Sequence, residues 1–234
     1  MNLTEVRSKL RASAKPGDAE FLQRFFKTGP GQYGEGDLFL GGRVPTARAL
    51  AKQCDLLPWV DLTSLLHSRY HEERLLALLI LVRRFQRGTE PERRAVYDFY
   101  LASTRWINNW DLVDLSAYHI IGAWLLERSR EPLLELVVSP MLWERRIAVV
   151  CTYAFIRAGQ FNDTLELSRR LLNDGHDLMH KACGWMLREV GKRDQAVLAG
   201  FLEQHSRAMP RTMLRYAIER FPEPERRAWL TRST

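Results

Sequence analysis

A chain of 234 residues, of which 46% are hydrophobic, can bury a substantial core, and this excludes a disordered or fibrous protein. Lysine and arginine number 35 against 28 aspartates and glutamates, and the formal net charge of +7 favours polyanions or acidic surfaces as partners. No apolar run reaches the length of a membrane span and the first residues lack a signal-peptide pattern, so we expect a cytoplasmic protein that does not bind membranes.

The first part of the chain, residues 1–70, is expected to hold amino-terminal helices interrupted by one irregular stretch. This stretch, residues 28–44, carries six glycines, and loops of such length in a compact domain are often functional. Its glycines match neither the G-x-x-x-x-G-K phosphate loop nor the dinucleotide-binding fingerprint, and no predicted strand precedes them. We therefore expect a functional loop that binds no nucleotide cofactor.

The remainder, residues 71–234, resembles a repeated pair of helices. Apolar residues follow the helical period, and runs of alternating β-branched residues are absent from the chain. The pairs recur at intervals of about 32 to 39 residues, within the range of helical solenoid repeats. Their first helices are expected to begin near His71, Trp110, Leu142, Asp177 and Pro210. The sequence thus predicts one all-α domain over residues 1–234, a superhelical stack of antiparallel helical pairs, for which we expect a monomer.

Three basic residues fall at one position when successive repeats are aligned: Arg146, Lys181 and Arg211. Stacked repeats present equivalent positions as a line, so these side chains are expected to form a positive stripe in a basic groove on the concave face. The alternative is that long charged side chains simply begin exposed helices. The nearby Trp143 and Trp185 favour the stripe.

Two tryptophans lie one helical turn from a charged residue. Trp110 precedes Asp114 by four positions and Trp185 follows Lys181 by four, so each pair shares a helix face. An aromatic plane beside a carboxylate suits stabilisation of a cation or general-base chemistry on a nucleic acid. Core packing is the usual role of a helical tryptophan, and Asp114 could instead cap a helix or pair with an arginine. Its position beyond the first turn of an apolar helix argues against a cap.

The cysteines and histidines of the chain lack the spacing that a metal site requires. Cys54, Cys151 and Cys183 lie far apart in apolar helical contexts, which is typical of buried thiols in a reducing compartment. His67 and His71 are four residues apart but lack a third ligand nearby. We expect neither a metal nor another cofactor.

These motifs resemble the DNA alkylation repair enzyme family, the AlkD-like DNA glycosylases built from HEAT-like repeats. The resemblance runs across most of the chain and is carried by five segments: residues 33–45, 72–77, 110–114, 145–148 and 181–189. The pattern W-D-x-V-D at 110–114 and the pattern K-A-x-G-W-x-L-R-E at 181–189 are specific when they occur together.

The resemblance implies a monofunctional alkylpurine DNA glycosylase that hydrolyses the N-glycosidic bond of cationic purines, of the 3-methyladenine and 7-methylguanine type, in double-stranded DNA. Such an enzyme acts in base excision repair and is nucleoid-associated if bacterial. The family's catalytic aspartate falls on Asp114. Its two nucleotide-holding tryptophans fall on Trp110 and Trp185, and its phosphate-contacting arginine falls on Arg146. Other DNA-contacting positions fall on Phe25 and Arg43.

Two departures from the family pattern bear on lesion preference. Leu178, Met179 and His180 stand where some members carry aromatic residues, and Arg43 stands where at least one relative has glutamine. Two other functions stay open. One is a catalytically weak member that binds distorted or branched DNA, and the other is a HEAT-like scaffold for an acidic protein. The pairing of Asp114 with Trp110 favours the enzyme over both.

Overall fold

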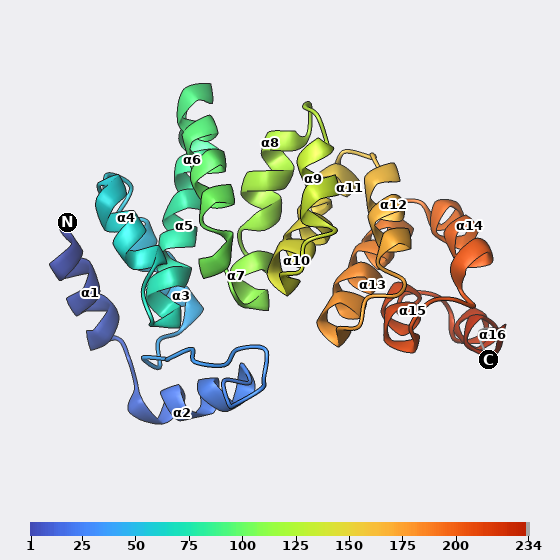
Figure 1. Ribbon diagram of the computed structural model, residues 1–234, viewed down its shortest axis with the longest axis horizontal. Coiled ribbons are helices and arrows are strands. Elements are labelled where there is room, and N and C mark those ends of the chain that lie inside the picture. The colour runs from blue at the N-terminus through green and yellow to red at the C-terminus, as the bar shows by residue number, and fades with distance from the viewer. Residues whose placement is uncertain (233–234) are drawn as a thin grey trace. The chain divides into compact units, whose positions relative to one another are not determined.

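The computed structural model describes residues 1–232, which form helices joined by turns and by one longer loop (Figure 1). Among these residues there is no β-strand, although one isolated parallel bridge joins Leu38 to Tyr70. The prediction of an all-α protein is therefore confirmed. The sequence predicted a single domain, and the contacts divide the chain into two compact units, Met1–Ile120 and Ile121–Thr234.

The first unit is built around one long buried helix, α5. This helix packs against α3, α4, α6 and α7, and its residues from His71 to Val82 are buried. The polar start of α5 is part of this core, because His71, Glu72, Glu73 and Arg74 are all buried with partners from other segments. The bounds of the elements in this unit are α1 (Leu3–Ala12), α2 (Pro16–Phe25), α3 (Val44–Ala51), α4 (Trp59–Leu66), α5 (His71–Arg87), α6 (Glu90–Ala102), the 3-10 helix η1 (Thr104–Trp106) and α7 (Trp110–Asp114).

The second unit is built around α13, which packs against α10, α12, α14 and α15. Its core is aliphatic, with Ile147, Val150, Met186 and Leu187 among the fully buried side chains. The bounds of its elements are α8 (Ala123–Leu125), α9 (Glu131–Leu136), α10 (Leu142–Cys151), α11 (Tyr153–Arg157), α12 (Asn162–Arg170), α13 (Asp177–Gly191), α14 (Gln195–His205), α15 (Arg211–Ala217) and α16 (Glu223–Arg232).

The predicted starts of the repeats are confirmed. Helices α5, α7, α10 and α13 begin at the expected residues, and α15 begins one residue after Pro210. The repeat that begins at Trp110 is less regular than predicted, because α7 ends at Asp114 and is followed by a turn and by the π-helix η2 (Tyr118–Gly122). Single turns of π-helix are frequent at functional sites.

The cysteines match their prediction, since Cys54, Cys151 and Cys183 are buried free thiols. Burial raises the pKa of all three, that of Cys183 to about 12, so the thiols stay protonated and unreactive. None of the described helices is both long and apolar enough to cross a membrane.

Candidate active site

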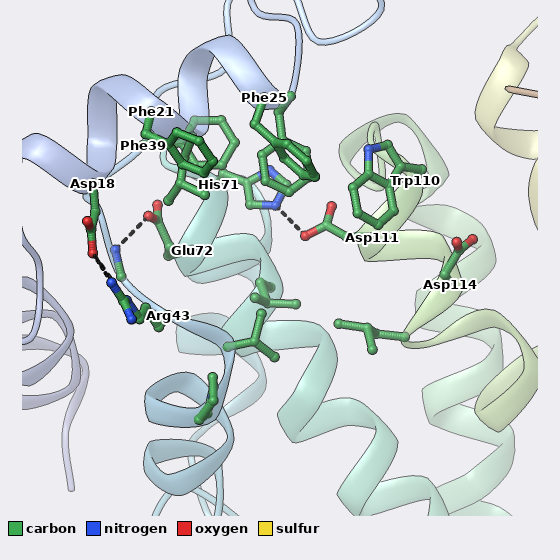
Figure 2. Close-up of a pocket in the computed structure, with 17 residues that line it drawn as sticks. Asp18, Phe21, Phe25, Phe39, Arg43, His71, Glu72, Trp110, Asp111 and Asp114 are labelled. Atoms are coloured by element: carbon green, nitrogen blue, oxygen red, sulfur yellow. Dashed lines mark hydrogen bonds and ion pairs between the residues drawn. The ribbon is translucent and has the colours of Figure 1, made fainter.

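A pocket of about 520 Å³ lies in the first unit, between α2, the segment before α3, the start of α5 and α7 (Figure 2). Its lining is mostly apolar, with a few charged side chains among the aromatic ones. Four of the predicted site residues line it: Phe25, Arg43, Trp110 and Asp114. The structure therefore brings together residues that are far apart in the sequence, such as Phe25 and Asp114.

Aromatic rings form one wall of the pocket. Trp110 stacks on Phe26 with ring centroids 5.2 Å apart, and the edge of Phe25 meets Trp110 at 5.9 Å. Phe21 stacks on Phe25 from the preceding turn of α2, and both of these phenylalanines are exposed. Large flat side chains at the mouth of a pocket favour a planar ligand, because ring stacking adds to the free energy of burial.

The short helix α7 carries two carboxylates that line the pocket, those of Asp111 and Asp114. Asn109 caps it, since the Asn109 side chain accepts a hydrogen bond from the Trp110 backbone N–H at 2.9 Å. Within the helix, Trp110 and Asp114 are one turn apart, and both line the pocket as the sequence predicted. Asp114 is the last helical residue and is only partly buried, whereas Asp111 is buried. The two carboxylates of α7 thus occupy different environments.

Asp111 belongs to a buried network centred on His71. The Nε2 atom of His71 lies 2.8 Å from Asp111 Oδ2, and its Nδ1 atom lies 3.3 Å from Asp37 Oδ2. Burial alone would lower the pKa of His71, but the charge of Asp111 and the hydrogen bonds to Asp111 and Asp37 raise that pKa to about 9. At neutral pH His71 is therefore an imidazolium that donates from both ring nitrogens.

Asp37 is the second carboxylate of this network. Burial would raise the pKa of Asp37, whereas the hydrogen bond from His71 and the charges of Arg74 and His71 hold it below its usual range. The Nδ2 atom of Asn108 also donates to Asp37, at 3.1 Å. The network thus ties the glycine-rich loop to the start of α5 and to the segment before α7.

The imidazolium of His71 also packs against the aromatic rings that line the pocket. His71 stacks on Phe39 at 4.5 Å and lies 5.0 Å from Phe26, which in turn stacks on Trp110. A cation next to aromatic faces is stabilised by their quadrupoles. The ring of Trp110 is therefore held by a continuous stack that ends at a buried charge.

The glycine-rich loop is fixed against the pocket by Glu72. The carboxylate of Glu72 accepts hydrogen bonds from the backbone N–H groups of Leu40, Gly41 and Gly42 at 2.9 to 3.1 Å. Gly41 has a φ of +92°, and a Cβ there would lie 2.1 Å from the carbonyl oxygen of Lys15. Only glycine allows this approach of the loop to the start of α2.

Arg43 lies at the edge of the pocket, where it precedes α3. Its Nε and Nη2 atoms donate to Asp18 Oδ2 at 3.2 and 3.0 Å, and the guanidinium is exposed. Exposed ion pairs of this kind contribute little to stability. Arg43 can therefore exchange Asp18 for another anion at small cost.

Trp185 belongs to the second unit, where it is half-buried on α13. Its ring lies near that of Tyr153, with ring centroids 6.5 Å apart. The residue before it, Gly184, faces α15 so closely that a Cβ there would lie 2.5 Å from the Met213 carbonyl oxygen and from Tyr216 Cβ. The glycine of the K-A-x-G-W pattern therefore serves helix packing.

The three predicted stripe residues differ in their surroundings. Arg146 is only 5% exposed, and its Nη1 atom donates to the Leu178 carbonyl oxygen at 2.7 Å. Lys181 is partly exposed and pairs with Asp177 at 2.7 Å. Arg211 is exposed and donates to the Leu230 carbonyl oxygen at 2.6 Å.

The predicted common register of these residues is corrected in one respect. Arg146 and Lys181 are each the fifth residue of their helices, α10 and α13, but Arg211 is the first residue of α15. The alignment of the sequence matched the basic residues of the repeats. The structure instead starts α15 directly after Pro210, which is its N-cap and has no backbone N–H to donate.

Comparison with known proteins identifies the family of this chain. The family model of the DNA alkylation repair enzymes matches residues 6–221. The chain belongs to this family. Among solved structures, a predicted DNA alkylation repair enzyme from Enterococcus faecalis is similar, with a TM-score of 0.70 and 16% identity over 90% of this chain and 98% of that one. At such low identity the likeness shows the fold, a HEAT-like α-solenoid. No curated protein matches the chain.

The pocket and its surroundings also contain residues that the sequence did not predict. His71, Asp111 and Asp37 form the buried network, and Phe21, Phe26 and Phe39 extend the aromatic wall. The two aspartates lie inside segments that carry the family resemblance: Asp111 in the W-D-x-V-D pattern and Asp37 in residues 33–45. Phe21 and Phe26 lie on and just after α2, which carries no chemical motif, whereas Phe39 lies in the glycine-rich segment.

Proposed function

We propose that this member of the DNA alkylation repair enzyme family is a monofunctional DNA glycosylase. Its substrates are cationic alkylated purines, of the 3-methyladenine and 7-methylguanine type, in double-stranded DNA. The observation that carries the proposal is the position of Asp114 beside Trp110 on the wall of an aromatic pocket. A carboxylate and an aromatic face both stabilise positive charge, and a base that is already cationic can leave without a metal or a proton donor.

The reaction that fits these groups is hydrolysis of the bond between deoxyribose C1′ and the purine nitrogen. The alkylated base already carries a positive charge, so it leaves with the bonding electron pair and becomes neutral without being protonated. Positive charge then develops on the sugar, where the Asp114 carboxylate stabilises it electrostatically. A water molecule bonds to C1′ through its oxygen, and its surplus proton passes to Asp114 and from there to solvent.

The aromatic wall would hold the cationic nucleotide. Trp110 and Phe25 line the pocket, and the face of a tryptophan attracts a cation by about 0.5 to 2 kcal/mol, depending on how dry the site is. This preference favours a charged lesion over an unmodified, neutral purine.

The groups in the pocket support release of the base without cleavage of the strand. A glycosylase that also nicks DNA needs an amine to form a Schiff base. Among the described residues that line the pocket there is no lysine. Lys181 of the second unit, which pairs with Asp177, is assigned to phosphate instead.

The proposal is tested by incubating the protein with duplex DNA that contains 7-methylguanine or 3-methyladenine and measuring released free base in a single turnover. Wild type should release base, and Asp114→Asn should release it at least tenfold more slowly, which corresponds to about 1.4 kcal/mol of barrier. DNA affinity of the variant, measured in parallel, should be unchanged. Base release at the wild-type rate by Asp114→Asn would remove Asp114 from the mechanism, and DNA binding without any release would favour a binding protein.

A further inference from the structure

A cluster of arginine and aromatic side chains lies outside the pocket in the first unit, where the segments that precede α5 and α7 meet. His67 stacks on Trp106 with ring centroids 4.7 Å apart and an angle of 19° between the planes. This contact joins the turn after α4 to the 3-10 helix η1. We name the cluster the basic-aromatic patch, and it consists of His67, Arg69, Tyr70, Arg105 and Trp106.

The two arginines of the patch lie over aromatic rings instead of forming ion pairs with carboxylates. The guanidinium carbon of Arg105 is 5.3 Å from the centroid of Trp106, and that of Arg69 is 5.9 Å from the centroid of Tyr70. Both arginines are exposed, and neither has a carboxylate partner within residues 1–232. In contrast, Arg87 and Arg94 of the same unit, each 64% exposed, pair with Asp55 and Asp98 at 2.7 and 2.8 Å.

An arginine that rests on a ring is suited to bind a phosphate. Stacking uses the flat face of the guanidinium and leaves the N–H groups at its edge free to donate. These groups match the oxygens of a phosphate in a bidentate arrangement. The ring also restricts the long side chain, so less conformational entropy is lost when an anion binds.

At neutral pH His67 contributes a stacked ring to the patch and no positive charge. Burial and then the charge of Arg105 hold the pKa of His67 below its usual range, so the imidazole is neutral at pH 7. The positive charge of the patch therefore comes from its arginines.

The patch adjoins the candidate active site along two segments of the chain. Trp106 precedes Trp110 by four residues and His67 precedes His71 by four, and both Trp110 and His71 line the pocket. Four residues of chain span at most about 14 Å, which is about four nucleotides of a strand at about 3.4 Å each.

We propose that the basic-aromatic patch binds the phosphate backbone of DNA on one side of the nucleotide that enters the pocket, with Arg69 and Arg105 donating to phosphate oxygens. This proposal rests on DNA as the partner, which the family implies, and is independent of the glycosylase reaction. Contacts to phosphate carry no sequence information, so the patch serves every sequence alike.

The test compares two double variants that remove the same charge. Arg69→Ala/Arg105→Ala removes the unpaired arginines of the patch, and Arg87→Ala/Arg94→Ala removes two equally charged, exposed arginines that are paired elsewhere in the unit. Affinity for a short undamaged duplex is measured over a range of salt concentrations. The patch variant should bind more weakly, and its plot of log affinity against log salt should be shallower by about 1 to 2, because each phosphate contact contributes about 0.9 to the slope.

The control variant should keep the wild-type slope. Equal changes in both variants would show a general effect of charge and overturn the proposal. An unchanged slope in the patch variant would also overturn it and would leave an acidic protein as the partner of the patch. Since the duplex is undamaged, these results do not depend on base release, and a failure of the glycosylase proposal is seen separately with Asp114→Asn.

A second measurement needs no variant. A phosphate bound by Arg105 offsets the charge that depresses the pKa of His67, so that pKa should rise when DNA saturates the protein. The ring resonances of His67, followed by NMR against pH with and without the undamaged duplex, report it. An unchanged pKa of His67 in the saturated complex would contradict binding at the patch.

Discussion

Asp111 and Asp114 belong to the same short helix but lie in different surroundings. Asp111 is buried and bound to His71 at 2.8 Å, so its charge is neutralised within the protein. Asp114 lies on the wall of the pocket, where a ligand can approach it. A carboxylate stabilises a developing cation most when it is fixed beforehand, and the His71–Asp111 contact fixes the helix that carries Asp114.

The raised pKa of His71 predicts a dependence of stability on pH. The imidazolium is favoured in the folded protein up to about pH 9, whereas an unfolded histidine titrates near 6.5. This contribution is therefore complete below pH 6.5 and is lost as the pH rises through 9, and the loss is of the order of 3 kcal/mol. Denaturant unfolding from pH 6 to pH 9.5 should show the decline, and His71→Gln should flatten it. An equally steep decline in His71→Gln would assign it to another group.

Two tryptophans of the second unit give a matched comparison. Trp143 is 7% exposed in α10, whereas Trp185 is half-buried in α13. Trp143→Ala should cost about 3 to 5 kcal/mol of unfolding free energy, as large core truncations do. Trp185→Ala should cost less than half as much but slow base release at least tenfold, if Trp185 holds the damaged nucleotide. Chemical unfolding and base release measured on the same preparations check both, and a loss of stability at Trp185 equal to that at Trp143 would assign Trp185 to the core.

At the scale of elements, the packing of α13 against α15 depends on one glycine. A Cβ on Gly184 would lie 2.5 Å from the backbone oxygen of Met213, and backbone cannot move aside as a flexible side chain can. Gly200, on α14, has no atom within 4 Å of the corresponding position apart from its chain neighbours and the backbone of its own helix. The two residues therefore separate the cost of a clash from the gain in helix propensity.

We expect opposite results from alanine at these two glycines. Gly184→Ala should destabilise the protein by about 1 to 3 kcal/mol, because the two helices must separate. Gly200→Ala should stabilise it by up to about 1 kcal/mol, the difference in helix propensity. Thermal unfolding of both variants tests the prediction, and a stabilised Gly184→Ala would show that α13 and α15 are packed less closely.

At the scale of the whole molecule, the positively charged side chains differ in their accessibility to solvent. The net charge of +7 attracts DNA at long range. Arg146 is a buried cation that bonds to a backbone carbonyl, whereas Lys181 and Arg211 are accessible to solvent. Only accessible cations release counterions from DNA when it binds.

The salt dependence of DNA affinity should reflect this division. Lys181→Ala/Arg211→Ala should reduce the slope of log affinity against log salt by about 1 to 2 and leave the melting temperature nearly unchanged. Arg146→Met should instead lower the unfolding free energy by about 1 to 3 kcal/mol, because the Leu178 carbonyl loses its donor. A wild-type slope in the double variant would place Lys181 and Arg211 away from the DNA.

The sequence by itself determined the features that arise from local periodicity. The starts of α5, α7, α10 and α13, the all-α class and the burial of the cysteines follow from apolar spacing and from the prolines between helices. The shared face of Trp110 and Asp114 is equally local, because one turn of helix fixes it.

Only the tertiary structure decided what these residues contact. His71 meets Asp37 and Asp111 across 34 and 40 positions of sequence, and nothing in the spacing of three polar residues predicts such a network. The burial of Arg146 is of the same kind, since its helix register alone is compatible with exposure. Helical periodicity records which residues share a face, whereas the partner of that face depends on contacts between distant segments, which form only when the chain has folded.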